Sequence, residues 1–148
     1  MADRHTLKDG PAVFRPWQAG VIAEHVAGSE ENFVELMMKY VKRMGLSNTN
    51  FVNATGWPEE NHYSSARDIA KLSSLLIKDF PEHYSLYKEK SFTYNNIPQR
   101  NRNALLWQDD SIDGIKTGHT ETAGFCLVSS GKRDDTRLIS VIIKSNSE

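Results

Sequence analysis

The chain has 148 residues, of which 39% are hydrophobic, and its formal net charge at pH 7 is −1. This length suits one domain with a core of its own, and the balanced charge offers no basic excess that would attract nucleic acid. The single cysteine, Cys126, excludes an internal disulfide, and its place in an apolar run predicts a small buried strand residue.

The sequence also shows no signal for membrane insertion or export. No apolar run reaches the length of a membrane span, and the first residues lack the hydrophobic core of a signal peptide. We therefore expect no membrane segment, and the sequence by itself leaves the cellular location open.

Two helices are predicted in the first half of the chain. Residues 30–44 carry apolar side chains at steps of three and four, with Ser29 placed to cap the start and Gly45 to end the helix. A second helix is expected from Ser65 to about residue 78. Ser65 and Asp68 have the spacing of a capping box, so we expect Asp68 to lie in a solvated cap.

The second half of the chain has the pattern of strands. A short hairpin is predicted at residues 91–96, because two asparagines follow a run of strand-forming residues. Three longer strands are expected at residues 112–117, 124–130 and 137–143, with residues 131–135 as the turn between the last two.

The first of these strands carries the run DGIKTGHT at positions 113–120. The ammonium of Lys116 and the hydroxyl of Thr117, on an open strand edge, can hold a carboxylate together, while Gly118 lets a ligand backbone approach closely. His119 follows directly. Taken alone, the tripeptide has a plainer interpretation, an ordinary hairpin strand with an exposed lysine and threonine.

The surrounding sequence makes the motif more specific. Lys-Thr-Gly is one of three motifs of penicillin-binding proteins and serine β-lactamases, beside Ser-x-x-Lys and Ser-x-Asn. Further matching words occur in family order: AEHVAGS at 23–29, MGLSNTNF at 44–51, YSSARD at 63–68, YKEK at 87–90, NRN at 101–103 and RLIS at 137–140. The chain thus resembles the D-alanyl-D-alanine carboxypeptidases, the low-molecular-mass penicillin-binding proteins.

The resemblance implies an α+β fold: a partial penicillin-binding-protein/β-lactamase-like domain with helices packed on a short antiparallel sheet. Residues 1–18 resemble nothing in the family, so we expect an unmatched leader followed by a truncated catalytic domain over residues 19–148. The predicted strands would be three of the family's five. Their missing cover predicts exposed apolar surface unless the chain rearranges or self-associates through the exposed sheet.

The implied activity is serine-type hydrolysis of D-Ala-D-Ala in peptidoglycan stem peptides, without a cofactor. A serine activated by lysine attacks the penultimate carbonyl, releases D-alanine and is freed by water; β-lactams acylate the same serine. By resemblance, Lys116, Thr117, Gly118 and His119 would contact the substrate. Members of the family work in the cell envelope.

The nucleophile motifs are absent from their family positions, where Ser-x-Asn would fall at residues 14–16. We therefore expect no catalytic residue in this chain and no activity of the chain alone. The alternative is a noncatalytic remnant that binds peptidoglycan peptide or another protein.

One literal Ser-x-x-Lys lies at Ser85 to Lys88. On a helix this spacing puts the hydroxyl and the amine on one face, which keeps the pair as a candidate. It aligns with a noncatalytic word of the family beside Pro81, and we expect an exposed lysine beside a turn serine. The histidines show no paired spacing, so we predict no metal site.

Overall fold

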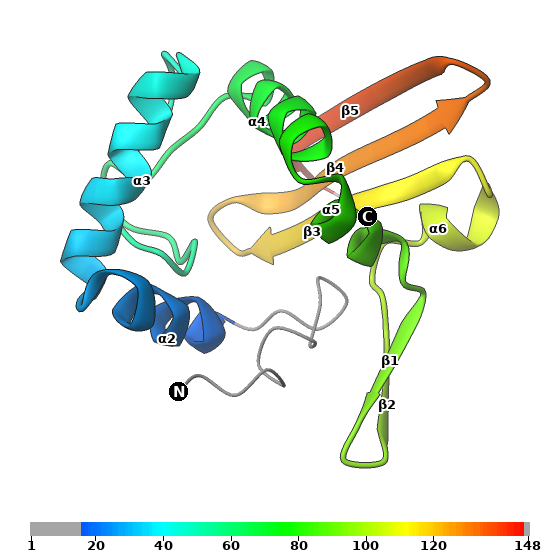
Figure 1. Cartoon of the computed structure of the whole chain (residues 1–148), viewed down its shortest axis with the longest axis horizontal. Helices are drawn as coiled ribbons and strands as arrows, with labels where there is room; N and C mark the ends of the chain where they lie inside the picture. The colour runs from blue at the N-terminus through cyan, green and yellow to red at the C-terminus, as the bar shows by residue number, and fades with distance from the viewer. Residues whose placement is uncertain (1–15, 147–148) are drawn as a thin grey trace.

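The structure is a computed structural model that describes residues 16–146. Helices occupy its first half: α2 (Pro16–Ala27), α3 (Glu30–Met44), α4 (Ala66–Asp79), the short α5 (Pro81–Tyr84) and the 3-10 helix η2 (Ser85–Lys88) (Figure 1). The expected leader, residues 1–18, lies mostly outside the described residues, and its last residues belong to α2.

Helix α3 begins and ends where its local sequence predicts. The Ser29 hydroxyl accepts a hydrogen bond from the Asn32 amide at 3.2 Å, which satisfies a backbone donor that the first turn leaves free. Gly45 takes φ 64°, a left-handed conformation that suits glycine, and its amide donates to the Lys42 carbonyl. The predicted helix over residues 30–44 is confirmed.

Helix α4 also has its predicted start, since the Ser65 hydroxyl accepts from the Asp68 amide at 3.2 Å. The expected solvated position of Asp68 is wrong, because its exposed fraction is only 2%. Its Oδ2 accepts from the Asn48 amide and from the Thr49 hydroxyl, both at 2.7 Å. The carboxylate therefore joins α4 to the loop that follows α3.

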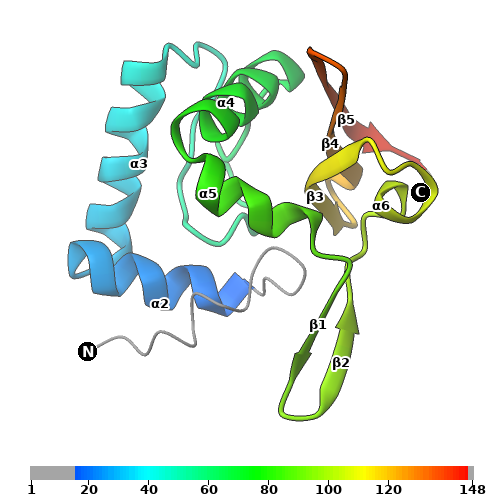
Figure 2. The same cartoon turned by 45° about the vertical axis from the view of Figure 1, so that its right-hand side comes forward.

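The predicted hairpin is present as β1 (Ser91–Tyr94) and β2 (Ile97–Arg100). Asn95 and Asn96 have φ of 48° and 60°, the left-handed conformation that a two-residue hairpin turn requires and asparagine tolerates. The hairpin projects away from the helices and from the larger sheet (Figure 2).

The larger sheet has the antiparallel order β3-β4-β5, formed by β3 (Ile112–Thr120), β4 (Gly124–Arg133) and β5 (Thr136–Ser145). The three strands are those predicted, but they are longer. The expected five-residue turn at 131–135 is wrong, because Gly131, Lys132 and Arg133 pair with β5. The true turn needs only two residues, of which Asp134 has φ 50°.

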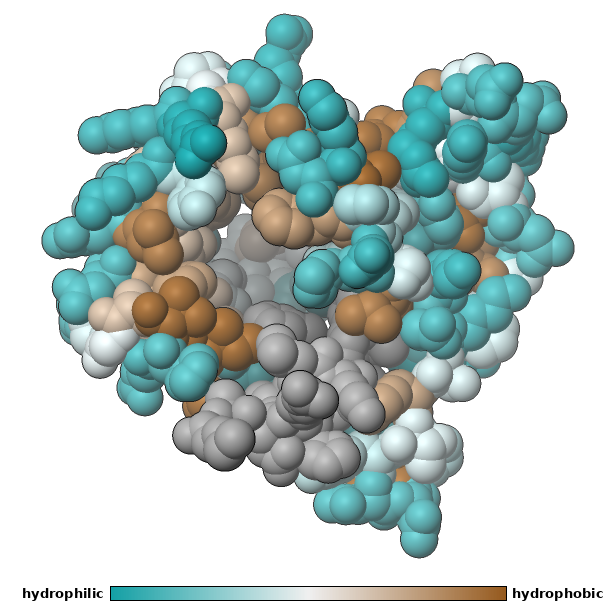
Figure 3. Space-filling model, in the orientation of Figure 1, coloured by the Kyte–Doolittle hydropathy of each residue, from teal (hydrophilic) through white to brown (hydrophobic). Residues whose placement is uncertain are grey.

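Helices cover part of this sheet. Helix α4 packs against β5, while η2 and α6 (Leu105–Gln108) pack against β3, where Leu106 and Ile115 are buried. Other apolar side chains stay exposed, including Val26 on α2 and Leu138 on β5, and hydrophobic surface is visible on the helical side (Figure 3). The expected α+β class is confirmed. In the described part, no helix is long and apolar enough to cross a membrane.

Candidate functional site

The second half of β3 forms one wall of an open cleft with a volume of about 1550 Å³. The other walls come from the loop that includes Thr55 and Trp57, from the segment 102–108, and from β4. Elements far apart in the sequence therefore meet around Lys116 and Thr117.

The strand pairing sets the positions of Lys116 and Thr117, which lie opposite Val128 and Leu127. The Lys116 ammonium donates to the Thr117 carbonyl, so the side chain folds back onto the backbone of its own strand. Burial of the amine, followed by the positive charge of Arg102, lowers the pKa of Lys116 below its ordinary value of 10.5. A second cation therefore stands near the lysine in the cleft.

Gly118 and His119 continue the same wall. A Cβ built on Gly118 would meet only the Cβ of Cys126, at an ordinary 3.9 Å, so packing within the chain does not require glycine there. The His119 ring lies against that of Phe125 with centroids 4.1 Å apart. The structure places all four residues of the Lys-Thr-Gly-His run along the cleft; their contacts with a ligand stay a prediction.

The observed exposure of Cys126 differs from the buried position that the sequence predicts. The cysteine lies opposite Gly118 in the sheet, and the glycine has no side chain to cover it. Instead of being fully buried, Cys126 is half-buried and lines the cleft.

Arg102 is a cleft residue that the sequence interpretation did not identify. It stands between Asn101 and Asn103, whose exposed fractions are 8% and 1%. Asn101 donates to the Glu89 carbonyl at 2.9 Å and Asn103 to the Gly114 carbonyl at 3.1 Å, so both amides anchor the segment while Arg102 stays exposed on the cleft side. The alternation of two asparagines around an arginine is the signal that could have pointed to it.

The loop between α3 and α4 forms the opposite side of the cleft. Its ends are held by paired backbone hydrogen bonds of 2.9 Å between Asn50 and Tyr63. Within it, His62 Nδ1 accepts from the Val52 amide at 3.2 Å, and burial lowers the pKa of His62, which favours the neutral ring that this bond needs. Trp57 is 65% exposed at the rim of the cleft.

The candidate pair Ser85 and Lys88 lies in η2, outside the residues that line the cleft. The Ser85 hydroxyl donates to the Glu82 carbonyl at 2.6 Å, and both side chains are exposed. This is the arrangement of a turn serine beside a solvated lysine.

A second Ser-x-x-Lys motif, which the sequence analysis did not identify, runs from Ser129 to Lys132. It lies in β4, where side chains alternate between faces, so residues three apart point to opposite sides of the sheet. Ser129 is 4% exposed and its hydroxyl reaches the Gly114 carbonyl at 3.4 Å. Ser129 does not line the cleft.

Within residues 16–146, no group of three or more His, Cys, Asp or Glu side chains is placed to hold a metal ion.

Comparison with known proteins agrees with this architecture. Residues 18–147 match the family model described as D-alanyl-D-alanine carboxypeptidase. The chain is 51% identical over 124 residues to the D-alanyl-D-alanine carboxypeptidase DacA of Haemophilus influenzae, covering 82% of this chain and 32% of that protein. It is 50% identical over 123 residues to DacA of Escherichia coli K12, covering 82% and 30% of the two chains.

Solved structures show the same relationship. Penicillin-binding protein 5 of Haemophilus influenzae matches with a TM-score of 0.82 at 49% identity, covering 86% of this chain and 38% of that one. Penicillin-binding protein D2 of Listeria monocytogenes, in its ampicillin-bound form, matches with a TM-score of 0.79 at 28% identity, covering 88% and 54%. The chain spans about a third of the length of these curated relatives. It belongs to the D-alanyl-D-alanine carboxypeptidase family.

Proposed function

We propose that this chain provides the carboxylate-binding wall of a serine-type D-Ala-D-Ala carboxypeptidase site for peptidoglycan stem peptides. The observation that carries the proposal is the placement of Lys116 and Thr117 on one strand along the open cleft. An ammonium and a hydroxyl that line the same cleft suit a terminal carboxylate, and a charge-assisted hydrogen bond contributes about 1.5–3 kcal/mol.

Two neighbouring features support an extended peptide as the ligand. Gly118 leaves open space where the chain itself would tolerate a side chain, and a ligand backbone can use that space. Arg102 adds a second positive charge to the cleft. A peptide that ends in a free carboxylate meets both conditions.

Acyl transfer of this kind needs a serine in a Ser-x-x-Lys pair, and the serine and the cysteine that line the cleft, Ser145 and Cys126, do not belong to one. Neither Ser85 nor Ser129 lines the cleft, and no Ser-x-Asn occurs in the 148 residues. We therefore propose that these 148 residues alone bind the peptide without forming a covalent intermediate. The function of the site as an enzyme would then depend on a serine and lysine supplied by other residues.

Two assays separate binding from catalysis. Incubation with a fluorescent penicillin is expected to leave no labelled protein band, and a diacetyl-Lys-D-Ala-D-Ala peptide is expected to release no D-alanine above background. A Ser85→Ala variant serves as the control. Labelling or D-alanine release that disappears in Ser85→Ala would contradict the proposal and make Ser85 the nucleophile.

The role of the carboxylate is tested with two peptides that differ only at their C-terminus. We expect saturation-transfer NMR to detect the D-Ala-D-Ala acid and to lose the signal with the C-terminal amide. Binding should also weaken with added salt, since the interaction is ionic and partly exposed. Equal binding of acid and amide would show that carboxylate recognition is not the basis of affinity.

A further inference from the structure

Strand β3 has an irregularity immediately before the Lys-Thr-Gly run. Ile112 pairs with Gly131 and Gly114 pairs with Ser130, so two steps along β3 match one step along β4. Asp113 is the extra residue of this β-bulge. Bulges bend a strand and redirect its side chains, so the position of Asp113 bears on every residue that follows it in β3.

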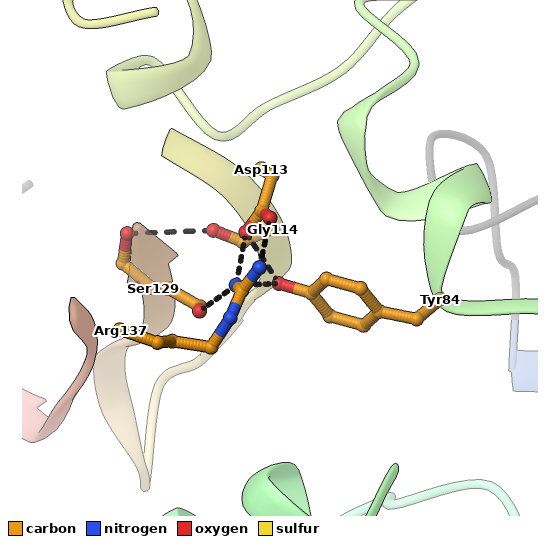
Figure 4. Close-up of polar contacts among 6 residues, drawn as sticks. Tyr84, Asp113, Gly114, Ser129 and Arg137 are labelled. Atoms are coloured by element: carbon orange, nitrogen blue, oxygen red, sulfur yellow. Dashed lines mark hydrogen bonds and ion pairs between the residues drawn. The ribbon is translucent and has the colours of Figure 1, made fainter. Parts of the chain in front are cut away.

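The Asp113 carboxylate is held from two other elements (Figure 4). Arg137 of β5 donates Nη1 to Oδ1 and Nη2 to Oδ2, both at 2.7 Å, which is the bidentate geometry of a strong charge-assisted pair. The Tyr84 hydroxyl of α5 donates to Oδ1 at 2.7 Å. We call these three residues the clasp.

The protonation states suit these bonds. Burial above all, together with the bond to Asp113, raises the pKa of Tyr84 to about 12, so the hydroxyl keeps its proton. Burial alone would raise the pKa of Asp113, but the hydrogen bonds from Arg137 and Tyr84 hold it below its ordinary value of 3.8. At neutral pH each donor therefore faces an ionised acceptor.

Gly114, the next residue, is enclosed by the same neighbours. A Cβ on Gly114 would lie 2.7 Å from the Tyr84 hydroxyl oxygen, so only glycine fits beneath the tyrosine. Its carbonyl accepts from Asn103 at 3.1 Å and from Ser129 at 3.4 Å. The chain is thus fixed at the bulge by side chains from several separate segments.

We propose that the Tyr84–Asp113–Arg137 clasp is a positioning device that fixes the pairing register of β3 and thereby places Lys116 and Thr117 on the cleft. Successive strand residues face opposite sides, so a slip of one residue exchanges the faces of every side chain. Ile115 is 7% exposed and lies opposite Ser129. In the slipped register Lys116 would take that buried place.

The register arm of the test does not depend on a ligand. In isotope-labelled protein, cross-strand proton contacts between Thr117 and Leu127, and between Gly118 and Cys126, report the pairing seen here. Arg137→Met is expected to weaken these contacts and to broaden or double the amide signals of residues 112–118. Arg137→Lys, which keeps the charge without the bidentate fork, should restore part of the native pattern.

A neighbouring ion pair offers a matched control. Arg133 and Asp109 pair at 2.6 Å at the exposed end of the sheet, so Arg133→Met removes an arginine–aspartate bond of similar length without touching Asp113. It should leave the contacts of Thr117 and Gly118 unchanged. If Arg137→Met does not fold, Tyr84→Phe replaces it, and signal changes reaching Lys116 and Thr117 are then expected.

Native contacts at Thr117 and Gly118 in a folded Arg137→Met protein would overturn the inference, as would changes confined to residues 113 and 114 in Tyr84→Phe. The ligand arm rests on the proposed function: Arg137→Met should weaken peptide binding at least about tenfold, while Arg133→Met should not. Unchanged peptide affinity in Arg137→Met would likewise count against the clasp. Wild-type protein that binds no peptide but loses its register in Arg137→Met would contradict the proposed function and support the clasp.

Discussion

Thr49 donates its hydroxyl proton to Oδ2 of Asp68 at 2.7 Å, across 19 residues of sequence. The same oxygen accepts from the Asn48 amide, and both the threonine and the aspartate are buried. This contact holds the start of α4 against the segment that follows α3, near the start of the loop that closes one side of the cleft.

Replacing Asp68 with alanine is expected to destabilise the protein by about 2–4 kcal/mol, because the change leaves buried donors without an acceptor and hydrogen bonds to a charged group contribute roughly 1.5–3 kcal/mol each. Urea unfolding followed by circular dichroism measures the loss. Asp79→Ala, in the exposed last turn of the same helix, is the control and should change stability by less than about 0.5 kcal/mol. Equal effects of the two substitutions would contradict this account of Asp68.

The two glycines of β3 should respond differently to alanine. Gly114→Ala places a methyl group 2.7 Å from the Tyr84 hydroxyl and should cost about 1–3 kcal/mol of stability through forced rearrangement. Gly118→Ala meets only an ordinary contact and should stay within about 0.5 kcal/mol of the wild type.

Peptide binding provides a second test of Gly118. Gly118→Ala is expected to lower affinity for a D-Ala-D-Ala peptide although the fold is intact, since the methyl group occupies space that the ligand backbone would use. A Gly118→Ala protein with wild-type affinity would show that the ligand does not approach there.

Several features of the fold depend only on neighbouring residues and could be predicted from the sequence. The ends of α3 follow from Ser29 and Gly45, because a cap depends on residues within a few positions, and the hairpin follows from Asn95 and Asn96 for the same reason. The Lys-Thr-Gly run could be placed on a strand because its alternation is local.

Other features depend on partners that local patterns do not reveal. Asp68 is buried where it accepts from Thr49, Arg102 reaches the cleft between two anchored asparagines, and Asp113 at the bulge pairs with Arg137 from another strand. Cys126 is half-buried and lies opposite a glycine of the neighbouring strand. Each of these facts is a consequence of register or tertiary contact.

The charge of Lys116 should depend on Arg102. Burial and the neighbouring guanidinium both lower the pKa of Lys116, so Arg102→Gln is expected to move that pKa upward, toward 10.5. A lysine is charged below its pKa, so carboxylate binding should be lost as pH rises through the Lys116 pKa, and the substitution should shift that loss to higher pH.

The titration is followed through the Lys116 side-chain carbon and proton signals. Arg100→Gln is the control, because Arg100 lies over the Trp107 ring at 4.1 Å and is not among the causes that lower the pKa of Lys116. A Lys116 titration that is the same in wild type and Arg102→Gln would rule out the electrostatic coupling.

The most direct test of the central claim is an NMR titration of the labelled protein with a D-Ala-D-Ala peptide, comparing wild type with a Lys116→Ala, Thr117→Ala double variant. Lys132→Ala combined with Thr136→Ala, at the exposed far end of the sheet, is the matched control. We expect weak, salt-sensitive binding with shifts centred on residues 116–120, retained in the control and lost in the double variant. Shifts that persist unchanged without Lys116 and Thr117 would contradict the account.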